Sequence, residues 1–518
     1  MNILPYILVT MFLFSLILNY LSMINNKNSL ETVKDMGIGY NLGNTFDCYD
    51  YNIVEMNTPE EQITLNGNTL PTKQMIQKLK KYGFKTIRFP VTWIYFIDNE
   101  GNINTDWMSL VKEVIDLIIK EELYCILNIH KDGYFENWLS LGIEVKDKFI
   151  NLWTQIANEF KDYNNYLIFE SMNEAYLYDS ETYNYDYDTL LKLNQAFVDT
   201  IRNSGGNNIK RLLIVAGALN DLDMTCLSEY KIPVDPSNKF ALSLNYFIPL
   251  LFTKELYFEP YNWTIDDGFE ITYEPTLNWG NQEEYFQIIS DFDLMKNKLV
   301  NKGIPVIITE VGVLTEEKKN LESIREYLYM IFSITSDYDG IMSCLWDTSN
   351  KEYGDMNFYD REKDIWYDDK IKKNFKQISR GKYIKPMNFY IKTHFENKTN
   401  SNGQALDIKV GAKKALKIII NVRLTGTLFV DLDFKIYSYD MNGSSFEINF
   451  RKSDGKKQYD GTYIFTIDIS KIKCYEYIQV TTFFGPQFII LNNLTIEFEE
   501  SFNTIDYKSY KAAISNYI

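Results

Sequence analysis

The sequence predicts a (β/α)8 barrel followed by an antiparallel β-sandwich. Two patterns of apolar residues, one before and one after about residue 384, support this prediction. Up to about residue 384, short apolar runs alternate with amphipathic stretches of helical period, as parallel strands buried on both faces require. Beyond that point the apolar residues repeat every second position, and turn-forming sequences such as MNGSS and KSDGKK separate the runs, which is typical of antiparallel sheets. The length of 518 residues accommodates both domains.

Eight apolar runs are candidate barrel strands because they are short, rich in β-branched residues and mostly continuous. Gly83, Gly205 and Gly303 stand where the intervening helices are expected to end. Eight strands alternating with helices fit a barrel with insertions. The runs occupy residues 37–43, 85–91, 124–130, 166–175, 211–217, 240–247, 304–312 and 341–347, and the clearest helical patterns occupy 71–83, 106–123, 187–206, 283–303 and 319–334.

The first residues form a separate segment. Residues 3–24 are almost wholly apolar, and no charged side chain precedes Lys27, which predicts a signal peptide or an uncleaved signal anchor over residues 1–26. We therefore expect a catalytic barrel over 27–384, a sandwich over 385–518, and a secreted protein that is membrane-bound only if the leader is retained. Four sequons for N-glycosylation occur, at Asn262, Asn397, Asn442 and Asn493. Their glycosylation would require a eukaryotic secretory host.

Composition excludes several classes of protein. The formal net charge of −17 argues against nucleic-acid binding. With only His130 and His394, the chain has no His-rich metal site, and the five cysteines form no C-x-x-C pair, so we expect no metal or other cofactor. Aromatic residues make up 15% of the chain, and their flat faces suit sugar rings. Cys125 and Cys344 lie inside apolar runs and are predicted to be buried thiols. The sequence does not decide whether two of the other three cysteines form a disulfide.

Polar residues collect where the predicted strands end, which is where barrel enzymes place their active sites. Two carboxylates, Glu174 and Glu310, stand near the ends of the fourth and seventh runs. A pair of carboxylates among aromatic and amide groups suits glycosidic bond cleavage, in which one carboxyl protonates the leaving oxygen and the other attacks or activates water. The other polar or aromatic residues at strand ends are Asn41, Asn44, Arg88, Trp93, His130, Asn173, Asn245, Tyr246 and Trp346.

These motifs resemble glycoside hydrolase family 5, the cellulase family, and within it the subfamily 4 endoglucanases and xyloglucanases. The resemblance covers about residues 29–380 and rests on seven segments in barrel order. They are MGIGYNLGNTFD (36–47), GFKTIRFPVTW (83–93), ILNIHKDGYFENW (126–138), LIFESMNEA (167–175), SGGNNIKRLLIV (204–215), GIPVIITEVG (303–312) and IMSCLWD (341–347).

The resemblance implies a retaining mechanism with Glu174 as acid/base and Glu310 as nucleophile. It also implies that Arg88 orients the nucleophile, that His130 and Asn173 line the sugar subsite, and that Trp346 forms a platform beside the cleaved bond. Asn44, Asn245 and Tyr246 complete the expected substrate-binding set. Charge pairing with Arg88 is expected to keep Glu310 ionised. Further platform candidates, each equally compatible with packing, are Trp93, Trp138 and Trp279.

The chain departs from the family pattern after the sixth strand. The family has His-x-Tyr there, whereas this chain has Asn245-Tyr246-Phe247, so the hydroxyl normally given to the nucleophile is missing. Lys131 replaces a common second His, and Ala175 replaces the Pro that usually follows the acid/base. Two accounts stay open: a weakened site, or one in which Lys131 and Tyr246 have taken over these duties.

The predicted function is endo-cleavage of β-1,4 linkages in a plant cell-wall polysaccharide by a monomeric secreted enzyme. The alternative is a catalytically impaired glucan-binding protein that keeps the cleft, and a third interpretation is a membrane-tethered adhesion or scaffold protein. The sandwich is a candidate carbohydrate-binding module, although it holds no Trp. Its candidate sugar-stacking residues are Tyr437, Tyr439 and Tyr475.

Overall fold

A computed structural model describes residues 27–384 apart from a few short stretches, and beyond 384 it describes mainly strands. The stretches left out before 384 are 50–55, 57, 131–142, 179–183, 255–260, 265–269, 274–276, 316–318 and 350–355. The parts described after 384 are 398–400, 406–409, 415–425, 433–439, 445–451, 454–459, 462–468, 477–483 and 488–498. The predicted leader, Trp138, Lys131 and Tyr475 lie outside the described residues.

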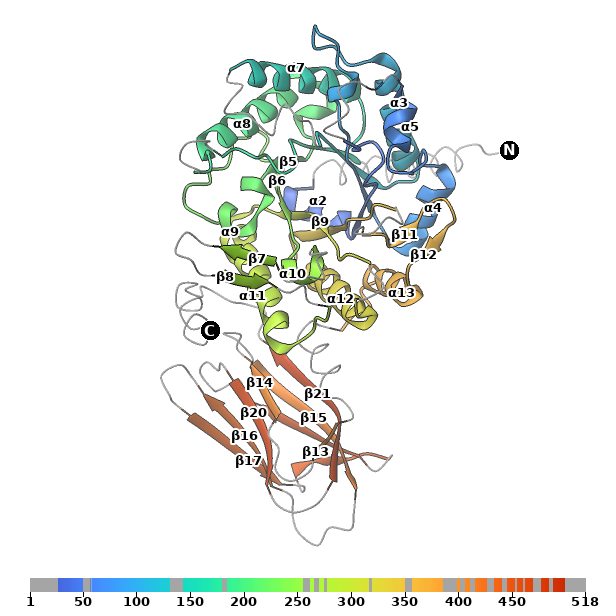
Figure 1. Cartoon of the computed structure of the whole chain (residues 1–518). Coiled ribbons are helices and arrows are strands. Elements are labelled where there is room, and N and C mark those ends of the chain that lie inside the picture. Colours follow the sequence, from blue (N-terminus) through green and yellow to red (C-terminus); the bar gives the residue numbers. More distant parts are fainter. Residues whose placement is uncertain are drawn as a thin grey trace, which may run out of the picture. The chain divides into compact units, whose positions relative to one another are not determined.

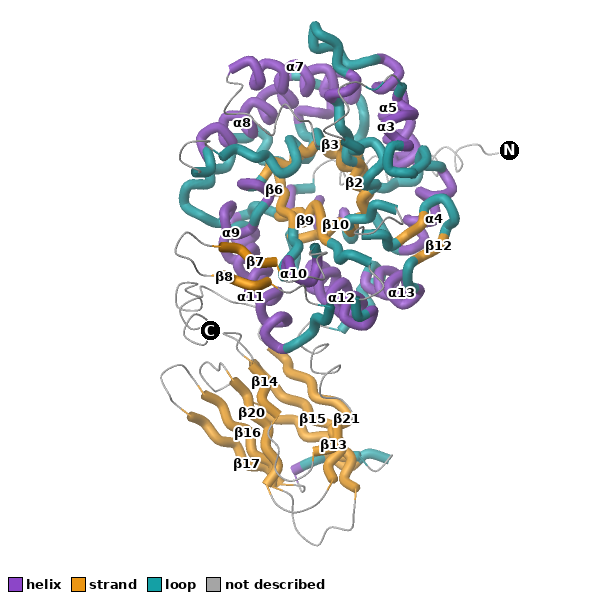
Figure 2. The backbone as a smooth tube through the Cα atoms, viewed as in Figure 1, coloured by secondary structure: helices purple, strands orange, loops and turns teal. Residues whose placement is uncertain are grey.

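Eight parallel strands close into a barrel, one from each of the eight predicted runs (Figures 1 and 2). Their order around the barrel follows the chain, with β10 pairing both β9 and β1. The prediction of a (β/α)8 barrel is confirmed. The strands are β1 (Gly39–Asn41), β2 (Thr86–Phe89), β3 (Tyr124–Asn128), β4 (Leu167–Glu170), β5 (Leu213–Ala216), β6 (Phe240–Asn245), β9 (Val306–Val311) and β10 (Ile341–Leu345).

Helices alternate with these strands, and their ends follow the local sequence. Thr72 accepts a hydrogen bond from a first-turn amide of α4, and Gly83 ends that helix at φ 110°, a left-handed conformation that glycine adopts without steric cost. The longer helices are α2 (Ser29–Met36), α4 (Lys73–Tyr82), α5 (Thr105–Lys120), α7 (Ile143–Phe160), α8 (Tyr187–Asn203), α11 (Gln282–Lys298), α12 (Leu321–Asp337) and α13 (Asp369–Ile378). Shorter elements are α3 (Pro59–Thr64), α9 (Leu222–Thr225), α10 (Leu250–Thr253) and the hairpins β7 (Tyr261–Thr264) with β8 (Glu270–Tyr273) and β11 (Tyr359–Asp360) with β12 (Ile365–Trp366).

One end of the barrel is closed by apolar packing. Val33 and Met36 of α2 share a buried cluster with inward-facing strand residues such as Ile126, Ile168 and Ile307. Burying this much apolar surface stabilises the barrel and fills its interior. The polar residues of the predicted site lie at the opposite end of the strands, so the fold itself separates the stabilising end from the chemical one.

The C-terminal part contains two antiparallel sheets, as predicted. One has the order β13-β21-β15-β19-β18 and the other β14-β20-β16-β17. The chain divides into two compact units, the first reaching Trp279 and resuming from Asp291 to Tyr383, and the second made of Gly280–Ser290 and the residues from Ile384 on. The strands are β13 (Lys398–Asn400), β14 (Leu406–Lys409), β15 (Ala415–Thr425), β16 (Asp433–Tyr439), β17 (Ser445–Arg451), β18 (Lys456–Lys457), β19 (Tyr463–Asp468), β20 (Tyr477–Phe483) and β21 (Phe488–Phe498).

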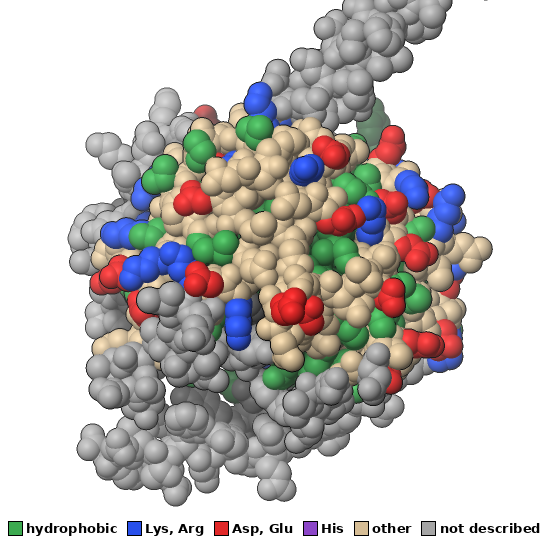
Figure 3. Space-filling view, turned by 90° about the horizontal axis from the view of Figure 1, so that it is seen from above, with side chains coloured by type: hydrophobic (Ala, Val, Ile, Leu, Met, Phe, Trp, Pro, Cys, Tyr) green, Lys and Arg blue, Asp and Glu red, His purple; other side chains and the backbone are tan. Residues whose placement is uncertain are grey.

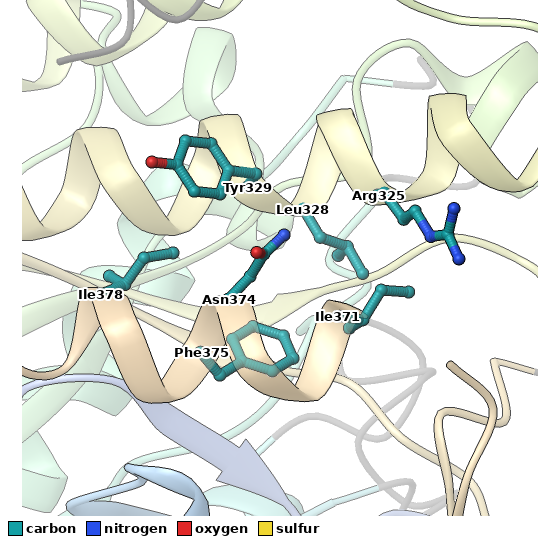
Figure 4. A pocket seen from close by; sticks show the side chains of 7 residues that line it. All are labelled: Arg325, Leu328, Tyr329, Ile371, Asn374, Phe375 and Ile378. Carbon is teal, nitrogen blue, oxygen red and sulfur yellow. The ribbon is translucent and has the colours of Figure 1, made fainter. Parts of the chain in front are cut away.

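The four cysteines within the described residues are free thiols, and Cys125 and Cys344 are buried as predicted. Within the same residues, no helix has the length and apolarity needed to cross a membrane. A pocket between α12 and α13 contains none of the predicted site residues (Figure 4). It is lined by Arg325, Leu328, Tyr329, Ile371, Asn374, Phe375 and Ile378.

Candidate active site

Arg88 is the centre of the site. It lies on β2, is fully buried, and donates a hydrogen bond from each of its five N–H groups. Two of these bonds form a fork on Glu170, with Nε 2.7 Å from Oε2 and Nη2 3.0 Å from Oε1. The other three go to Oε1 of Glu310 at 2.9 Å, Oδ1 of Asn41 at 3.1 Å and Oδ1 of Asn173 at 2.8 Å. A buried guanidinium is stable when its donors are paired in this way.

The register of the sheet explains why these residues meet. Asn41 is the register partner of Arg88, and Asn128 is the partner of Glu170, so side chains from four consecutive strands enter the barrel at nearby levels. Asn128 Nδ2 lies 3.3 Å from Glu170 Oε2. Glu170 stands four residues before Glu174, and sequence reasoning did not assign it a role. The signal that points to it is a charged residue within a strand that is buried throughout.

Glu310 is the predicted nucleophile, and it is only 6% exposed. Burial raises its pKa to about 7, while Arg88 lowers it and the nearby Glu174 raises it. The expectation that Arg88 favours the ionised form is therefore correct in direction. Burial has the larger effect on this pKa. Arg88 divides its charge between Glu310 and Glu170, so its attraction for Glu310 does not compensate for the removal of that carboxylate from water.

Glu174 is the predicted acid/base, and it is exposed just after the end of β4. Its backbone lies at φ 43°, a left-handed conformation that is uncommon for a residue with a side chain and is found at functional sites. Asn245 Nδ2 donates to Glu174 Oε1 at 2.6 Å, while Thr309 Oγ1 donates to Asn245 Oδ1 at 2.9 Å. Asn245 is also the register partner of Glu310, so it links Glu174 to the strand that carries Glu310.

Asn173 and Asn44 lie at the same end of the barrel, and both are half-buried. The Oδ1 atom of Asn173 accepts from Arg88, so the group that could donate to a sugar hydroxyl is its amide nitrogen. The backbone of Asn44 is left-handed at φ 54°, and its carbonyl accepts from Asn68 Nδ2 at 2.6 Å. Asn173 therefore fits the predicted sugar-contacting role, whereas the contacts of Asn44 in the structure are made by its backbone.

Trp346 and His130 stack on each other, with ring centroids 5.7 Å apart and ring planes 14° apart. Trp346 is half-buried, and an added Cβ at Gly43 would come within 3.1 Å of its ring, so glycine makes room for it. His130 is 1% exposed, with Nδ1 3.4 Å from Asn128 Nδ2 and Nε2 3.8 Å from Asp47 Oδ2. His130 is therefore almost wholly buried, and its contact in the site is the stacking on Trp346.

Tyr246 lies apart from the other predicted site residues, and its position in the structure does not support the prediction that it binds substrate. It is 1% exposed, and its hydroxyl donates to Asp291 Oδ2 on α11 at 2.7 Å. Successive residues of a strand point to opposite faces, so Asn245 faces the barrel interior and Tyr246 faces the outer helices. Because the Tyr246 hydroxyl donates to Asp291, the structure also gives no support to the account in which Tyr246 replaces the missing hydroxyl donor to Glu310.

Two of the three further tryptophan candidates are packing residues. Trp93 is fully buried, and its indole N–H donates to the Asn128 carbonyl at 3.1 Å. Trp279 is 5% exposed and packs on Phe252 and Tyr327. Within the described residues, no group of three His, Cys, Asp or Glu side chains is arranged to hold a metal ion.

Two carboxylates, one buried on an arginine and one exposed beside it, at the mouth of a (β/α)8 barrel are the arrangement that the two-carboxylate chemistry of glycoside hydrolases requires. Residues 44–352 match the family Cellulase (glycosyl hydrolase family 5), which is more than half of the chain. The chain therefore belongs to glycoside hydrolase family 5, as the sequence motifs indicated.

Curated relatives agree with this assignment. Endoglucanase A of Clostridium longisporum is 33% identical over 63% of this chain and 60% of its own length, and Endoglucanase B of Clostridium cellulovorans is 35% identical over 58% and 64%. The chain thus spans less than two thirds of either protein. A solved structure, described as a GH5-4 broad specificity endoglucanase from an uncultured bovine rumen ciliate, is 52% identical, with a TM-score of 0.65, and covers 69% of this chain and 99% of its own.

Proposed function

We propose that the protein is an endo-acting β-1,4-glucanase that retains anomeric configuration. The observation that carries this proposal is the Arg88–Glu310 ion pair of 2.9 Å beside the exposed Glu174, whose charge is close enough to raise the pKa of Glu310. This arrangement supplies one carboxylate held in place for attack and another open to solvent for proton transfer.

In the proposed first step, protonated Glu174 gives its proton to the glycosidic oxygen while ionised Glu310 attacks the anomeric carbon. The glycosidic bond breaks, the leaving chain departs as an alcohol, and the sugar becomes an ester of Glu310. In the second step Glu174 takes a proton from water, whose oxygen attacks the anomeric carbon and releases Glu310. Asn245 holds Glu174 during both transfers, and Arg88 stabilises the carboxylate that leaves.

We propose a neutral β-glucan as substrate. Acidic and basic side chains are interspersed over the face of the molecule shown in Figure 3. Solved relatives are described as broad specificity endoglucanases and as a lichenase from Caldicellulosiruptor sp. F32, with 31% identity for the latter, so several β-glucans are candidates.

The test is digestion of a polysaccharide panel by the chain starting at Lys27. Carboxymethylcellulose, xyloglucan, mixed-linkage glucan, mannan and xylan are compared for reducing ends and product length. Short oligosaccharides released early from a β-glucan are expected, and the first product should appear as the β-anomer by proton NMR. Absence of hydrolysis on every polysaccharide, or initial release of the α-anomer, contradicts the proposal.

A catalytically impaired glucan-binding protein is the second candidate. It is favoured by the Phe247 ring, which offers Glu310 no hydroxyl, and by the raised pKa of Glu310. Under this alternative, cellotetraose binds by calorimetry but stays intact over days, and Trp346→Ala abolishes binding.

We further propose that residues 1–26 direct secretion and that the C-terminal sheets bind carbohydrate. Tyr437 and Tyr439 are two residues apart on β16, and Tyr477 is the register partner of Tyr439, so the backbone places these three positions on one face of the sheet. The first proposal predicts that the full chain reaches the medium of a secretory host. The second predicts that Tyr437→Ala with Tyr439→Ala reduces retention on cellulose but not hydrolysis of soluble glucan.

A further inference from the structure

Among the charged groups with the largest influence on the pKa of Glu310, Arg88 and Lys254 favour the ionised carboxylate and Glu174 opposes it. Arg88 approaches it from β2 and shares its charge with Glu170. Glu174 approaches from the end of β4 and opposes ionisation, whereas Lys254, which follows α10, favours it. Sequence reasoning assigned no role to Lys254, because this residue does not follow a strand.

Lys254 is held in place by its neighbours. Its Nζ atom lies 3.8 Å from the centre of the Phe247 ring, within the range of a cation–π contact. The single turn of α10 carries it there, since the Lys254 amide donates to the Leu250 carbonyl at 2.9 Å. The buried Thr253 hydroxyl donates to the Phe247 carbonyl, and the Leu314 amide donates to the Thr253 carbonyl at 3.0 Å, which ties this turn to the segment after β9.

Phe247 lies two residues beyond Asn245, and the Tyr246 amide between them still donates to the Glu310 carbonyl, at 2.8 Å. Residues two apart in an extended chain point the same way, so Phe247 faces the side of Asn245. Its ring is 6% exposed and carries no donor for Glu310, but its face is the negative pole of an aromatic quadrupole. An ammonium placed over that face is attracted to the ring and remains beside the mouth of the barrel, where Lys254 is exposed.

We propose that Lys254, seated on the ring of Phe247, is a positioning residue that stabilises the carboxylate of Glu310. The pair supplies by charge what a hydroxyl at position 247 would supply by a hydrogen bond. This inference rests on the proposed function for its catalytic meaning, but its physical content, a cation that promotes ionisation of Glu310, is independent of turnover.

Two readouts therefore test it on the chain starting at Lys27. The first is the titration of Glu310 itself, by carbon-13 NMR of labelled glutamate carboxyls, with Glu310→Gln to assign the resonance. The second is the pH dependence of kcat/KM on the most active glucan of the panel. Lys254→Met keeps the approximate side-chain length and removes the positive charge, whereas Lys254→Arg keeps the positive charge. Lys296→Met is the matched control, because Lys296 makes a similar contact, 4.7 Å from the centre of the Tyr338 ring, but is not among the groups with the largest influence on the pKa of Glu310.

Lys254→Met is expected to raise the titration midpoint of Glu310 by about half a pH unit, the scale of a partly solvated charge pair. The acidic limb of kcat/KM should move by the same amount, which lowers activity about threefold at pH values below it. Lys254→Arg and Lys296→Met should titrate like the wild type. Raising the salt concentration should shift the wild type toward the Lys254→Met value, since solvent-exposed charges are screened.

The inference is overturned if Lys254→Met leaves the titration midpoint of Glu310 unchanged, or if Lys296→Met shifts it equally. A chain that hydrolyses no glucan but shows the expected shift in the carboxyl titration supports the inference and refutes the proposed function. A chain that hydrolyses glucan but shows no shift in the titration of Glu310 supports the proposed function and refutes the inference about Lys254. Thermal unfolding of each variant verifies that the fold is kept.

Discussion

Replacing Arg88 by lysine changes the most heavily bonded side chain of the site while keeping its positive charge. Arginine presents five N–H donors in a planar fork, and all five are used here on four buried or half-buried residues. A lysine ammonium has three donors and cannot reproduce the fork on Glu170. At least two acceptors around it therefore lose a hydrogen bond from a charged donor.

A hydrogen bond to a charged group contributes about 1.5–3 kcal/mol, so Arg88→Lys should lower the free energy of unfolding of the barrel by about 3–6 kcal/mol. That is a large part of the roughly 5–15 kcal/mol by which domains are typically stable. If Glu310 is one of the acceptors that lose their hydrogen bond, it should also titrate at a higher pH than in the wild type, because the hydrogen bond from Arg88 lowers the pKa of Glu310.

Urea unfolding followed by tryptophan fluorescence measures this loss in the intact chain, since all eight tryptophans lie at or before Trp366 and none lies in the C-terminal sheets. Arg325→Lys is the matched control. Arg325 pairs with Asp368 and Glu322 but is 24% exposed, so the same substitution there should cost less than about 1 kcal/mol. If Arg88→Lys costs no more than Arg325→Lys, the view of Arg88 as the hub of the site is wrong.

Three further predictions concern the carboxylates. Glu174→Gln and Glu310→Gln should each lower kcat by several orders of magnitude, about 4 kcal/mol or more in barrier, with circular dichroism unchanged; activity within about tenfold of wild type would contradict their roles. Because the pKa of Glu310 is raised to about 7 from 4.5, the folded state holds its proton between these values, and wild-type stability is lost as pH rises through that window. Glu310→Gln should therefore be more stable than the wild type at pH 8 by about 3 kcal/mol relative to their difference at pH 4, and equal pH dependence in urea unfolding would refute the burial argument. Phe247→Tyr should move the acidic limb of kcat/KM toward lower pH, by adding a hydroxyl donor to the stabilisation that Lys254 supplies; a limb that stays in place or moves toward neutral would show that a hydroxyl at this position does not reach Glu310.

The barrel, and the gathering of Arg88, Glu174 and Glu310 at one end of it, could be predicted from the sequence alone. All eight runs form strands of the closed barrel because a β-branched, continuously apolar run has no exposed face to present and must be buried on both sides. Glu174, Glu310 and Arg88 were assigned together because each lies in or directly after such a run, and parallel strands bring these positions to one end.

Which side of the barrel wall a residue faces, and what it meets there, became known only from the folded chain. Tyr246 stands between two inward-facing residues and points outward to Asp291, which depends on strand register and not on residue type. Glu170 contacts Arg88 from 82 positions further along the chain, and Lys254 contacts the Phe247 ring from seven positions further along. The sequence pattern does not predict either contact. The pKa of Glu310 likewise follows from its burial, a property of the closed barrel as a whole, whereas the sequence shows only its partners.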